Sequence, residues 1–389
     1  MPVNYLQIQG QIQEKCQQAR QNQAVYRERL DQAAALLTRY AADLDFLRQR
    51  VEDAQRADVS LRCAVPLNER LDTAVSPPNL AQLPLLLAAD GSQINPNRHD
   101  SVEFAVINTG IFRILPAADL TPGEEAETQL YLLEDINNPA APLTEEVVAL
   151  RRDLNERRLL ADRAGRETTR PVITLTDGPL ELYREPRENQ LFQQLFGEYL
   201  SVLQKTSQQG AVSAGYVDKP GSDLVIRLLE LAADSRLDVK ETTRRRPLGG
   251  VLDRVIFAGL LAPGQRSAVF VIQSSMAERF AAFDPALQPC FFYLNVGSHP
   301  ERAWMARVEI TRGVAEKPAL LEALHAVLLQ QCRQMGSKPY PYALHRAHEI
   351  ALITRLEKEQ IETMIARAMR AMGLEVGDKS AKQYHKDNL

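Results

Sequence analysis

The sequence has no long hydrophobic run and no signal peptide. Its longest apolar stretches, such as residues 83–89 and 268–272, are far shorter than the ~20 residues that cross a bilayer, so we predict no transmembrane segment. The N-terminus, MPVNYLQIQGQIQEK, lacks both the basic start and the apolar stretch of a secretory signal. We therefore expect a cytoplasmic protein that has no membrane partner.

Cysteine pairs, a dominant charge and a nucleotide-binding loop are also missing. The four cysteines are far apart and form no CxxC motif, which predicts free thiols and argues against a zinc site or a redox motif. Lys and Arg total 46 and Asp and Glu total 50, a net charge of -4, so any polyanion site must be local. No GxxxxGKS or GxxxxGKT sequence occurs, so we do not expect ATP hydrolysis through a P-loop.

The sequence does contain enough apolar residues, 45% of 389, to fill a sizeable core. Residues 4–58 lack proline, which favours one or two long helices. From Leu30 onward the apolar residues follow a heptad, typical of a helix that packs either on its own domain or on a second subunit. We predict an N-terminal helical segment for dimer or partner contact over 1–75, a catalytic domain over 76–373 and a flexible tail over 374–389. The heptad positions are Leu30, Ala33, Leu37, Tyr40, Leu44, Leu47, Val51 and Ala54.

Strands dominate the start of the larger domain. Runs of apolar and β-branched residues predict strands over 85–90, 102–108, 129–133 and 171–177, with a helix that begins after Thr144 between the last two. Later strands are predicted over 211–217, 268–273, 290–296 and 305–311, and later helices over 223–234, 317–335 and 342–372.

The order strand, strand, strand, helix, strand predicts an α/β fold of the ribonuclease H-like type, a mixed sheet flanked by helices. An antiparallel meander followed by a right-handed crossover places the fourth strand parallel to the first. Asp90 and Asp177, each expected at the end of an apolar strand and followed by glycine, would then be neighbours. Open α/β sheets bind their ligands at the carboxyl ends of such strands.

These aspartates predict metal chemistry. Together with Glu156 on the crossover helix, they offer the oxygen ligands that Mg²⁺ and Mn²⁺ prefer. Two such ions can stabilise the attacking and leaving oxygens when a phosphodiester is hydrolysed. We expect the glycine after each aspartate to let the backbone turn away sharply. Glu145 and Glu146 are alternatives to Glu156.

A second cluster of chemically active residues lies in SKPYPYALHRAHE, residues 337–349. His345 and His348 lie three apart on one helical face. Glu349 is adjacent to His348 rather than between the two histidines, so the zinc protease motif is absent.

Five segments together resemble the NurA nuclease family: AADGS at 88–92, TLTDGPLEL at 174–182, GYVDKP at 215–220, ARVEI at 306–310 and KPYPYALHRAHE at 338–349. The resemblance covers roughly residues 80–360. It implies a metal-dependent nuclease with a ribonuclease H-like core that trims 5′ ends at DNA breaks and prefers manganese. It also implies a homodimer that works with a hexameric HerA-type ATPase.

The resemblance assigns roles to individual residues. The carboxylates of Asp90, Asp177 and Glu156 would bind Mn²⁺ or Mg²⁺, and His348 would bind metal or move a proton. Tyr340 would orient the phosphate or stack on a base. The second motif reads Asp-Gly-Pro, in which Pro179 removes an amide donor from the turn.

Basic residues outside these motifs are candidates for DNA contacts. They are Lys219 and Arg307 near family-like motifs, and the loop run Arg244, Arg245 and Arg246. Two other functions stay open. One is an inactive adaptor for an ATPase, and the other is a metal-dependent phosphoesterase that acts on RNA or on small phosphate esters.

Overall fold

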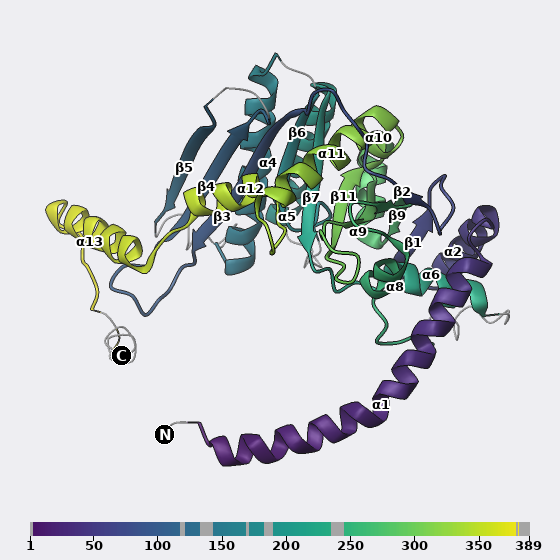
Figure 1. Cartoon of the computed structure of the whole chain (residues 1–389). Coiled ribbons are helices and arrows are strands. Elements are labelled where there is room, and N and C mark those ends of the chain that lie inside the picture. Colours follow the sequence, from purple (N-terminus) through teal and green to yellow (C-terminus); the bar gives the residue numbers. More distant parts are fainter. Residues whose placement is uncertain are drawn as a thin grey trace. The chain divides into compact units, whose positions relative to one another are not determined.

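The computed structural model describes residues 3–116, 121–132, 143–168, 171–182, 190–234, 245–378 and 380 (Figure 1). The chain forms two compact units. The first unit comprises Met1–Pro77, Val217–Ala282 and Gln288–Val308. The second unit comprises Pro78–Tyr216, Phe283–Leu287 and Glu309–Leu389.

The second unit contains the predicted ribonuclease H-like sheet. Its strands lie in the order β7-β6-β3-β4-β5; β3, β4 and β5 form an antiparallel meander, and β6 is parallel to both β3 and β7. The helix α4 connects β5 to β6, so the predicted crossover topology is confirmed. The elements are β3 Leu85–Ile94, β4 Ala105–Ile114, β5 Gly123–Tyr131, α4 Glu145–Arg166, β6 Val172–Asp177, α5 Gln190–Gln208 and β7 Ala211–Asp218.

Three predicted strand boundaries are wrong. The strand β3 does not end at Asp90 but continues to Ile94, because residues 90–94 pair with residues 106–110 of β4. The strand β4 begins and ends later than the predicted 102–108, and β5 begins before the predicted 129–133. The long ladder between neighbouring strands overrides the turn propensity of Asp-Gly-Ser.

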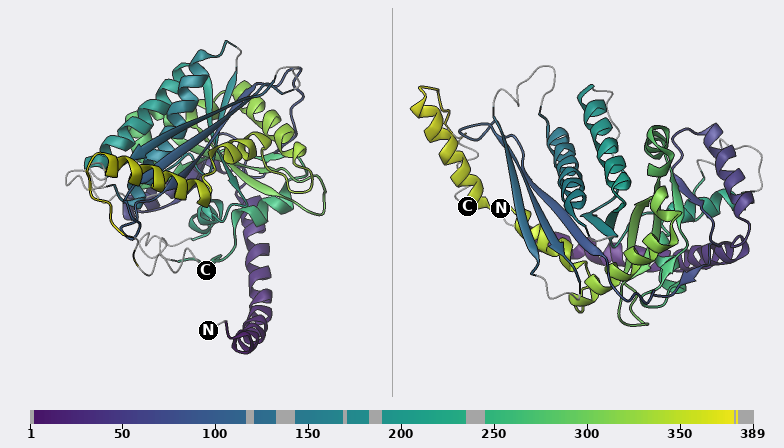
Figure 2. Two further views of the ribbon diagram at one scale, coloured as in Figure 1. Left: turned by 90° about the vertical axis from the view of Figure 1, so that its left-hand side faces the viewer. Right: turned by 90° about the horizontal axis from the view of Figure 1, so that it is seen from above.

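Helices cover both faces of this sheet. The helix α4 lies on one face of β3 and β4, and α12 lies on the opposite face (Figure 2). Leu85, Leu87 and Ala89 of β3 pack with Leu159 and Leu160 of α4 in a buried cluster. The helices that follow β11 in this unit are α10 Arg312–Ala315, α11 Pro318–Gln334, α12 Tyr342–Ala351 and α13 Arg355–Ala371, and a short 3-10 helix covers Pro285–Leu287.

The predicted single helix over 342–372 is therefore wrong: it is two helices. The side chain of Thr354 accepts a hydrogen bond from the Glu357 amide, and the Glu357 side chain accepts one from the Thr354 amide, which forms a capping box. In addition, the Ile353 amide donates to Oγ of Ser92 at 3.1 Å. These contacts begin a new helix where the apolar pattern alone would continue the old one.

The first unit has its own strands and core. Its strands follow the order β1-β9-β10-β11, and β8 pairs with β10 and β2. Its elements are α1 Tyr5–Arg39, α2 Leu44–Ala57, β1 Cys63–Pro66, β2 Ala74–Val75, α6 Leu224–Ala233, α8 Asp253–Leu260, β8 Arg266–Ser267, β9 Phe270–Gln273, α9 Ser275–Phe283, β10 Pro289–Asn295 and β11 Met305–Thr311. The last residue of α9 and the residues of β11 from Glu309 onward belong to the second unit.

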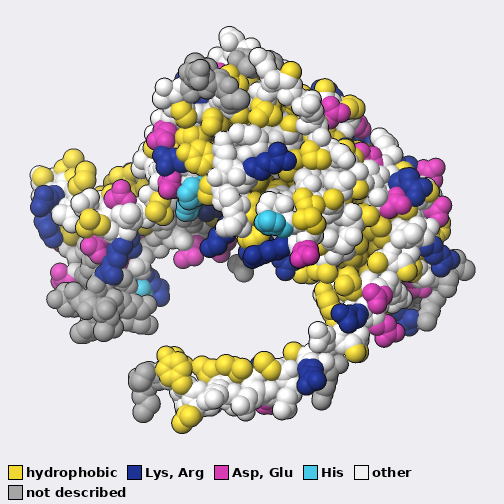
Figure 3. All heavy atoms as spheres, in the orientation of Figure 1, with side chains coloured by type: hydrophobic (Ala, Val, Ile, Leu, Met, Phe, Trp, Pro, Cys, Tyr) yellow, Lys and Arg dark blue, Asp and Glu magenta, His cyan; other side chains and the backbone are white. Residues whose placement is uncertain are grey.

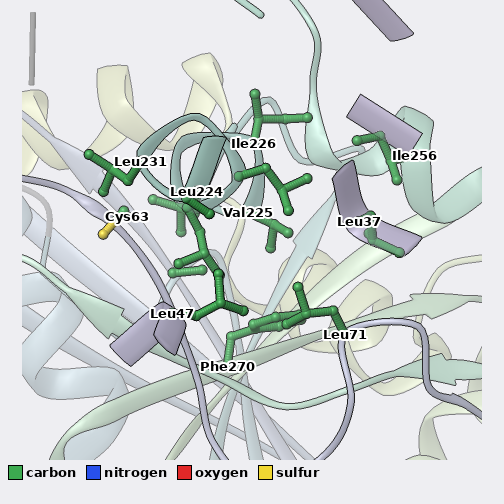
Figure 4. Packing of buried hydrophobic residues seen from close by; sticks show 14 of the residues in the cluster. Leu37, Leu47, Cys63, Leu71, Leu224, Val225, Ile226, Leu231, Ile256 and Phe270 are labelled. Atoms are coloured by element: carbon green, nitrogen blue, oxygen red, sulfur yellow. The ribbon is translucent and has the colours of Figure 1, made fainter. Parts of the chain in front are cut away.

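The heptad residues pack inside this unit. Leu37 and Leu47 lie in the same cluster as Leu224 and Val225 of α6 and Phe270 of β9 (Figure 4). The heptad from residue 30 onward therefore packs on its own unit, which was one of the two interpretations. The buried heptad positions are Ala33, Leu37, Tyr40, Leu47, Val51 and Ala54.

The first half of α1 differs, because residues 5–28 are exposed where their exposure is described. Figure 3 shows hydrophobic side chains along this half of the helix. Contact of this surface with a second subunit or a partner stays a prediction. Its exposed apolar residues are Tyr5, Leu6, Ile8, Ile12, Val25 and Tyr26.

Three smaller predictions concern the cysteines, membrane spans and tail. Cys16, Cys63, Cys290 and Cys332 are all free thiols, as predicted. In the described part of the chain, no helix is long and apolar enough to span a bilayer. Most of the predicted tail, residues 379 and 381–389, lies outside the described residues.

Candidate active site

Asp90 and Asp177 lie side by side on neighbouring parallel strands. The register pairs Leu85 with Val172 and continues to Ala89 with Thr176, so the two aspartates are the next residues along their strands. Neighbouring strands are about 4.8 Å apart, which brings the two carboxylates to one place at the end of the parallel ladder. The sequence placed them together correctly, although Asp90 lies within a strand and not at its tip.

The strand register also fixes which face of the sheet the aspartates share. Asp90 pairs with Gly110, against which the backbone of α12 packs so closely that a Cβ atom would lie 2.5 Å from the Ala347 carbonyl oxygen. Asp177 pairs with Tyr216, whose ring lies edge-on to that of Tyr340, with 5.6 Å between centroids. Because paired residues of adjacent strands point to the same face, both aspartates belong to the face covered by α12.

His348 contacts Asp90 directly. Its Nδ1 lies 2.7 Å from Oδ2 of Asp90, while Oδ1 of the same carboxylate accepts a hydrogen bond from the Gly91 amide at 2.9 Å. The His348 side chain is 59% exposed, so solvent or a ligand can reach the rest of the ring. His345 instead lies with its Nε2 3.5 Å from Glu349 and does not join this pair.

Gly91 and Gly178 follow the two aspartates for different reasons. A Cβ atom at Gly91 would lie 2.4 Å from Cγ of Arg152 and 2.7 Å from Oε1 of Glu156, so this glycine allows α4 to approach the strand. The expectation of a sharp turn at Gly91 is therefore wrong. At Gly178 it is right, because this residue has a φ of 89°, a value that glycine adopts readily.

Glu156 reaches this region from the other face of the sheet. Its side chain is buried, and Nε of Arg152 lies 3.6 Å from its Oε1. Burial raises the pKa of the Glu156 carboxyl well above its usual value, the negative charge of Asp153 raises it further, and Arg152 opposes both effects. Asp90 also raises this pKa, by less than Asp153 does.

The alternatives to Glu156 lie elsewhere on the helix. Glu145 and Glu146 are exposed residues in the first turn of α4. They precede Glu156 by about ten residues, which corresponds to roughly 15 Å along a helix. Of the three glutamates, Glu156 is thus the one that lies opposite Gly91.

Sequence reasoning missed Asp153, which lies one helical turn before Glu156. Oδ1 of Asp153 is 2.9 Å from Nη2 of Arg152. The spacing of three residues on one helix was the available signal, since it places both carboxylates on the same face.

A cavity of about 290 Å³ opens beside this group in the second unit. Arg157 and Tyr199 belong to its wall and are held in place. Arg157 is 3% exposed and donates to the Ala214 carbonyl and to Oγ1 of Thr176. The Tyr199 hydroxyl donates to the Leu180 carbonyl at 2.9 Å. The cavity is lined by Arg152, Asp153, Glu156, Arg157, Thr176, Asp177, Gly178, Pro179, Glu181, Leu182 and Tyr199.

The turn after Asp177 is held by a buried carboxylate that sequence reasoning also missed. Oε2 of Glu309 accepts hydrogen bonds from the amides of Leu180 at 2.8 Å and Glu181 at 3.1 Å. The Gly178 amide donates to the Tyr216 carbonyl at 2.8 Å. The turn is therefore fixed on both sides of Pro179, which has no amide hydrogen. Glu309 belongs to the ARVEI segment, but its partners could not be read from the sequence.

The predicted DNA-binding cations lie in the first unit, whereas the aspartates lie in the second. Arg307 is 8% exposed, with its guanidinium 5.9 Å from the centre of the Phe291 ring. Nζ of Lys219 lies 4.2 Å from the centre of the Trp304 ring.

The basic loop run is only partly described. Arg246 donates to the carboxylates of Glu230 and Asp223. Arg245 is exposed, and Arg244 lies outside the described residues. Contacts of these five cations with DNA stay predictions.

The strand register brings Asp90 and Asp177 together, His348 contacts Asp90, and Glu156 of α4 lines the same cavity as Asp177. Across the described ranges there is no group of three or more His, Cys, Asp or Glu side chains that is already close enough to hold a metal ion. The chemistry of the donors is nevertheless that of a divalent cation site, with hard carboxylate oxygens and one imidazole.

Comparisons with known proteins found one family model and several solved structures. The model of the NurA domain matches residues 84–353. Among solved structures, the NurA nuclease from Sulfolobus solfataricus is 12% identical with a TM-score of 0.48, and the match covers 88% of this chain and 96% of that chain. NurA with manganese is 11% identical with a TM-score of 0.35, covering 76% and 91%. The catalytic domain of human endonuclease V is 14% identical with a TM-score of 0.32, covering 85% and 99%. No curated protein matches the sequence.

Proposed function

This chain belongs to the NurA family of nucleases, and from that premise we propose that it is a metal-dependent enzyme that hydrolyses phosphodiester bonds of DNA. The observation that carries the proposal is the pair of aspartates, Asp90 and Asp177, in register at the end of the parallel ladder, with His348 on Asp90. The match to a nuclease family over residues 84–353 supports a nucleic acid substrate over a small phosphate ester.

We assign the metal to the carboxylates of Asp90, Asp177 and Glu156, with His348 as a further ligand. Mn²⁺ and Mg²⁺ are the ions that suit this donor set. When bound, such ions would supply positive charge to the attacking and leaving oxygens of the phosphodiester. The Gly91 amide fixes one oxygen of Asp90, and His348 fixes the other.

His348 and Tyr340 are proposed to act on the substrate side of these carboxylates. The exposed imidazole of His348 can hold or move a proton, since histidine is the side chain that most often does so in catalysis. Tyr340 is half-buried, and its ring rests against Tyr216. Its hydroxyl can orient a phosphate, or its ring can stack on a base.

We further propose that the chain resects DNA ends in the 5′-to-3′ direction, with single-strand endonuclease activity, during double-strand break repair. The sequence has no P-loop, so strand movement would need a partner, and a hexameric HerA-type ATPase is the partner that the family resemblance supports. The exposed half of α1 offers a surface for that ATPase or for a second copy in a homodimer.

The test is cleavage of single- and double-stranded DNA labelled at the 5′ or 3′ end, in Mn²⁺, Mg²⁺ or EDTA. We expect metal-dependent cleavage that Asp90→Asn and Asp177→Asn each abolish. Asp162→Asn is a matched control, because Asp162 is a half-buried α4 residue paired with Lys205 at 2.7 Å. Wild-type cleavage by either site variant would contradict the assignment. If no DNA is cleaved in any of these conditions, and none after the ATPase is added, the adaptor function is favoured.

A further inference from the structure

Arg152 is a cation placed among the carboxylates of the candidate site. Its Nη2 lies 2.9 Å from Asp153, and its Nε lies 3.6 Å from Glu156. Its aliphatic stem packs on Gly91, next to Asp90, and its charge is close enough to interact with Asp90 as well. The side chain is 30% exposed and lines the same cavity as Asp177.

The other arginines of this part of α4 have different partners. Arg151 lies over the Tyr131 ring, 5.2 Å from its centre. Arg157 lines the cavity but is buried and donates to a backbone carbonyl and to Thr176. Arg158 pairs with Glu198 at 2.7 Å on the exposed side. Arg152 is the one of the four that combines solvent exposure with a position on the cavity wall.

The contacts of Arg152 are of a kind that a ligand can replace. Its carboxylate partners are its helical neighbours Asp153 and Glu156, and the second is beyond hydrogen-bond distance. A guanidinium binds phosphate oxygens with two parallel hydrogen bonds, which makes arginine well suited to a phosphodiester. Cations entering among the same carboxylates would repel the guanidinium and release it for that contact.

We propose that Arg152 contacts the phosphate that is cut, and that without DNA it serves as the counter-ion of Asp153 and Glu156. This inference rests on the proposed nuclease function. It predicts opposite effects of removing the charge. Without the guanidinium, free metal should bind more tightly, since a like charge is gone, whereas the phosphodiester should be bound and cut less well.

The experiment compares wild type with Arg152→Gln, Arg152→Lys and the control Arg158→Gln, after thermal unfolding confirms that each is folded. Mn²⁺ binding without DNA is titrated by electron paramagnetic resonance, and cleavage of a short single strand is measured with saturating metal. For Arg152→Gln we expect Mn²⁺ to bind several-fold more tightly. We expect kcat/KM to fall roughly 10- to 100-fold, the range for a lost hydrogen bond to a charged group.

The two other variants sharpen the comparison. Arg152→Lys keeps the charge but loses the two parallel hydrogen bonds, so it should bind Mn²⁺ like wild type and recover part of the cleavage. Arg158→Gln should match wild type in both measurements, because it removes an equal charge from the exposed side of the helix.

Two results would overturn the assignment of Arg152 while leaving the nuclease proposal in place. If Arg152→Gln weakens both Mn²⁺ binding and cleavage, Arg152 supports the carboxylates structurally. If it cleaves like wild type while Asp90→Asn does not, the nuclease proposal survives and Arg152 is not a substrate contact. A wild-type protein that cleaves no DNA with any metal or with the ATPase would instead remove the proposed function, and the Arg152 assignment with it.

Discussion

A single buried carboxylate, Glu309, holds the turn that follows Asp177. We expect Glu309→Leu to leave the amides of Leu180 and Glu181 without this acceptor, at a cost of about 1–3 kcal/mol for each buried group. Hydrogen exchange at these two amides should accelerate, and cleavage should fall. Glu309→Gln keeps an acceptor oxygen and should retain most of the protection. Unchanged exchange in Glu309→Leu would show that the turn is fixed by other contacts.

We expect Asp253 to make the stability of the first unit depend on pH. Its carboxylate accepts hydrogen bonds from the amides of Val225 and Ile226 at the start of α6 and from the Tyr293 hydroxyl. Burial raises the pKa of Asp253 to about 6, although these hydrogen bonds lower it. Since the folded pKa lies above the unfolded value, Asp253 stabilises the fold most below pH 4, and this contribution is lost as pH rises to about 6.

The size of this effect follows from the shift. A shift of two pKa units corresponds to about 3 kcal/mol, so the free energy of unfolding should decrease by up to that amount between pH 4 and 6 through this residue. Urea unfolding of wild type and Asp253→Asn across this range tests it. The variant should show a flatter pH dependence, and parallel curves for the two proteins would refute the role of Asp253.

At the scale of elements, the contact between α12 and β4 sets the position of His348. We expect Gly110→Ala to displace α12, because the new Cβ would lie 2.5 Å from the backbone oxygen of Ala347 and 2.6 Å from the amide nitrogen of Ala351. His348 on the same helix would move away from Asp90.

The measurements are cleavage and thermal unfolding. Cleavage by Gly110→Ala should fall at least roughly 10-fold, with about 1–3 kcal/mol lost from stability, as is usual for overpacking. Gly123→Ala is the matched control, since the nearest atom to its Cβ is 3.6 Å away. Equal activity of the two variants would mean that α12 tolerates the added methyl group without moving His348.

The elements that the sequence predicted well have strong local signals. The helix α4 begins where Thr144 accepts a hydrogen bond from the Val147 amide, and β6 is an apolar run that ends in Asp-Gly. The extension of β3 beyond Asp90 could not be predicted, because it depends on pairing with β4. The break after α12 was missed because Leu352 and Ile353 continue the apolar pattern.

The candidate site shows the same difference between features with a local or topological signal and features that depend on contacts with distant segments. Asp90 and Asp177 were predictable as neighbours because topology alone brings the ends of parallel strands together. The role of Gly91 was not predictable from the sequence, since it depends on the close approach of Arg152 from α4. Glu309 was missed because its two amide donors lie about 130 residues earlier in the chain.

At the scale of the whole molecule, the two units are not consecutive in the sequence. The predicted boundary after residue 75 lies close to Pro77, where the first segment of the first unit ends. The chain returns to that unit at Val217–Ala282 and again at Gln288–Val308. The core formed by α1, α2 and α6 therefore needs distant segments, and removing the whole N-terminal region should disturb it.

This organisation predicts different results for two N-terminal deletions. Residues before Leu30 make no contribution to the buried cluster among the described residues, whereas Leu37 and Leu47 lie within it. We expect deletion of residues 1–29 to leave the thermal unfolding temperature nearly unchanged but to weaken self-association or ATPase binding, because it removes the exposed apolar side of α1. Deletion of residues 1–57 should destabilise the fold as well.

Light scattering with and without the ATPase measures assembly, and cleavage of short single strands measures the site. Ile12→Glu is a sharper variant than the deletion, since it places one charge on the 55% exposed Ile12 side chain. It should weaken the same association while leaving folding and short-strand cleavage intact. If both Ile12→Glu and the shorter deletion assemble like wild type, the exposed half of α1 is not the contact surface, and dimer and ATPase contacts must lie elsewhere on the chain.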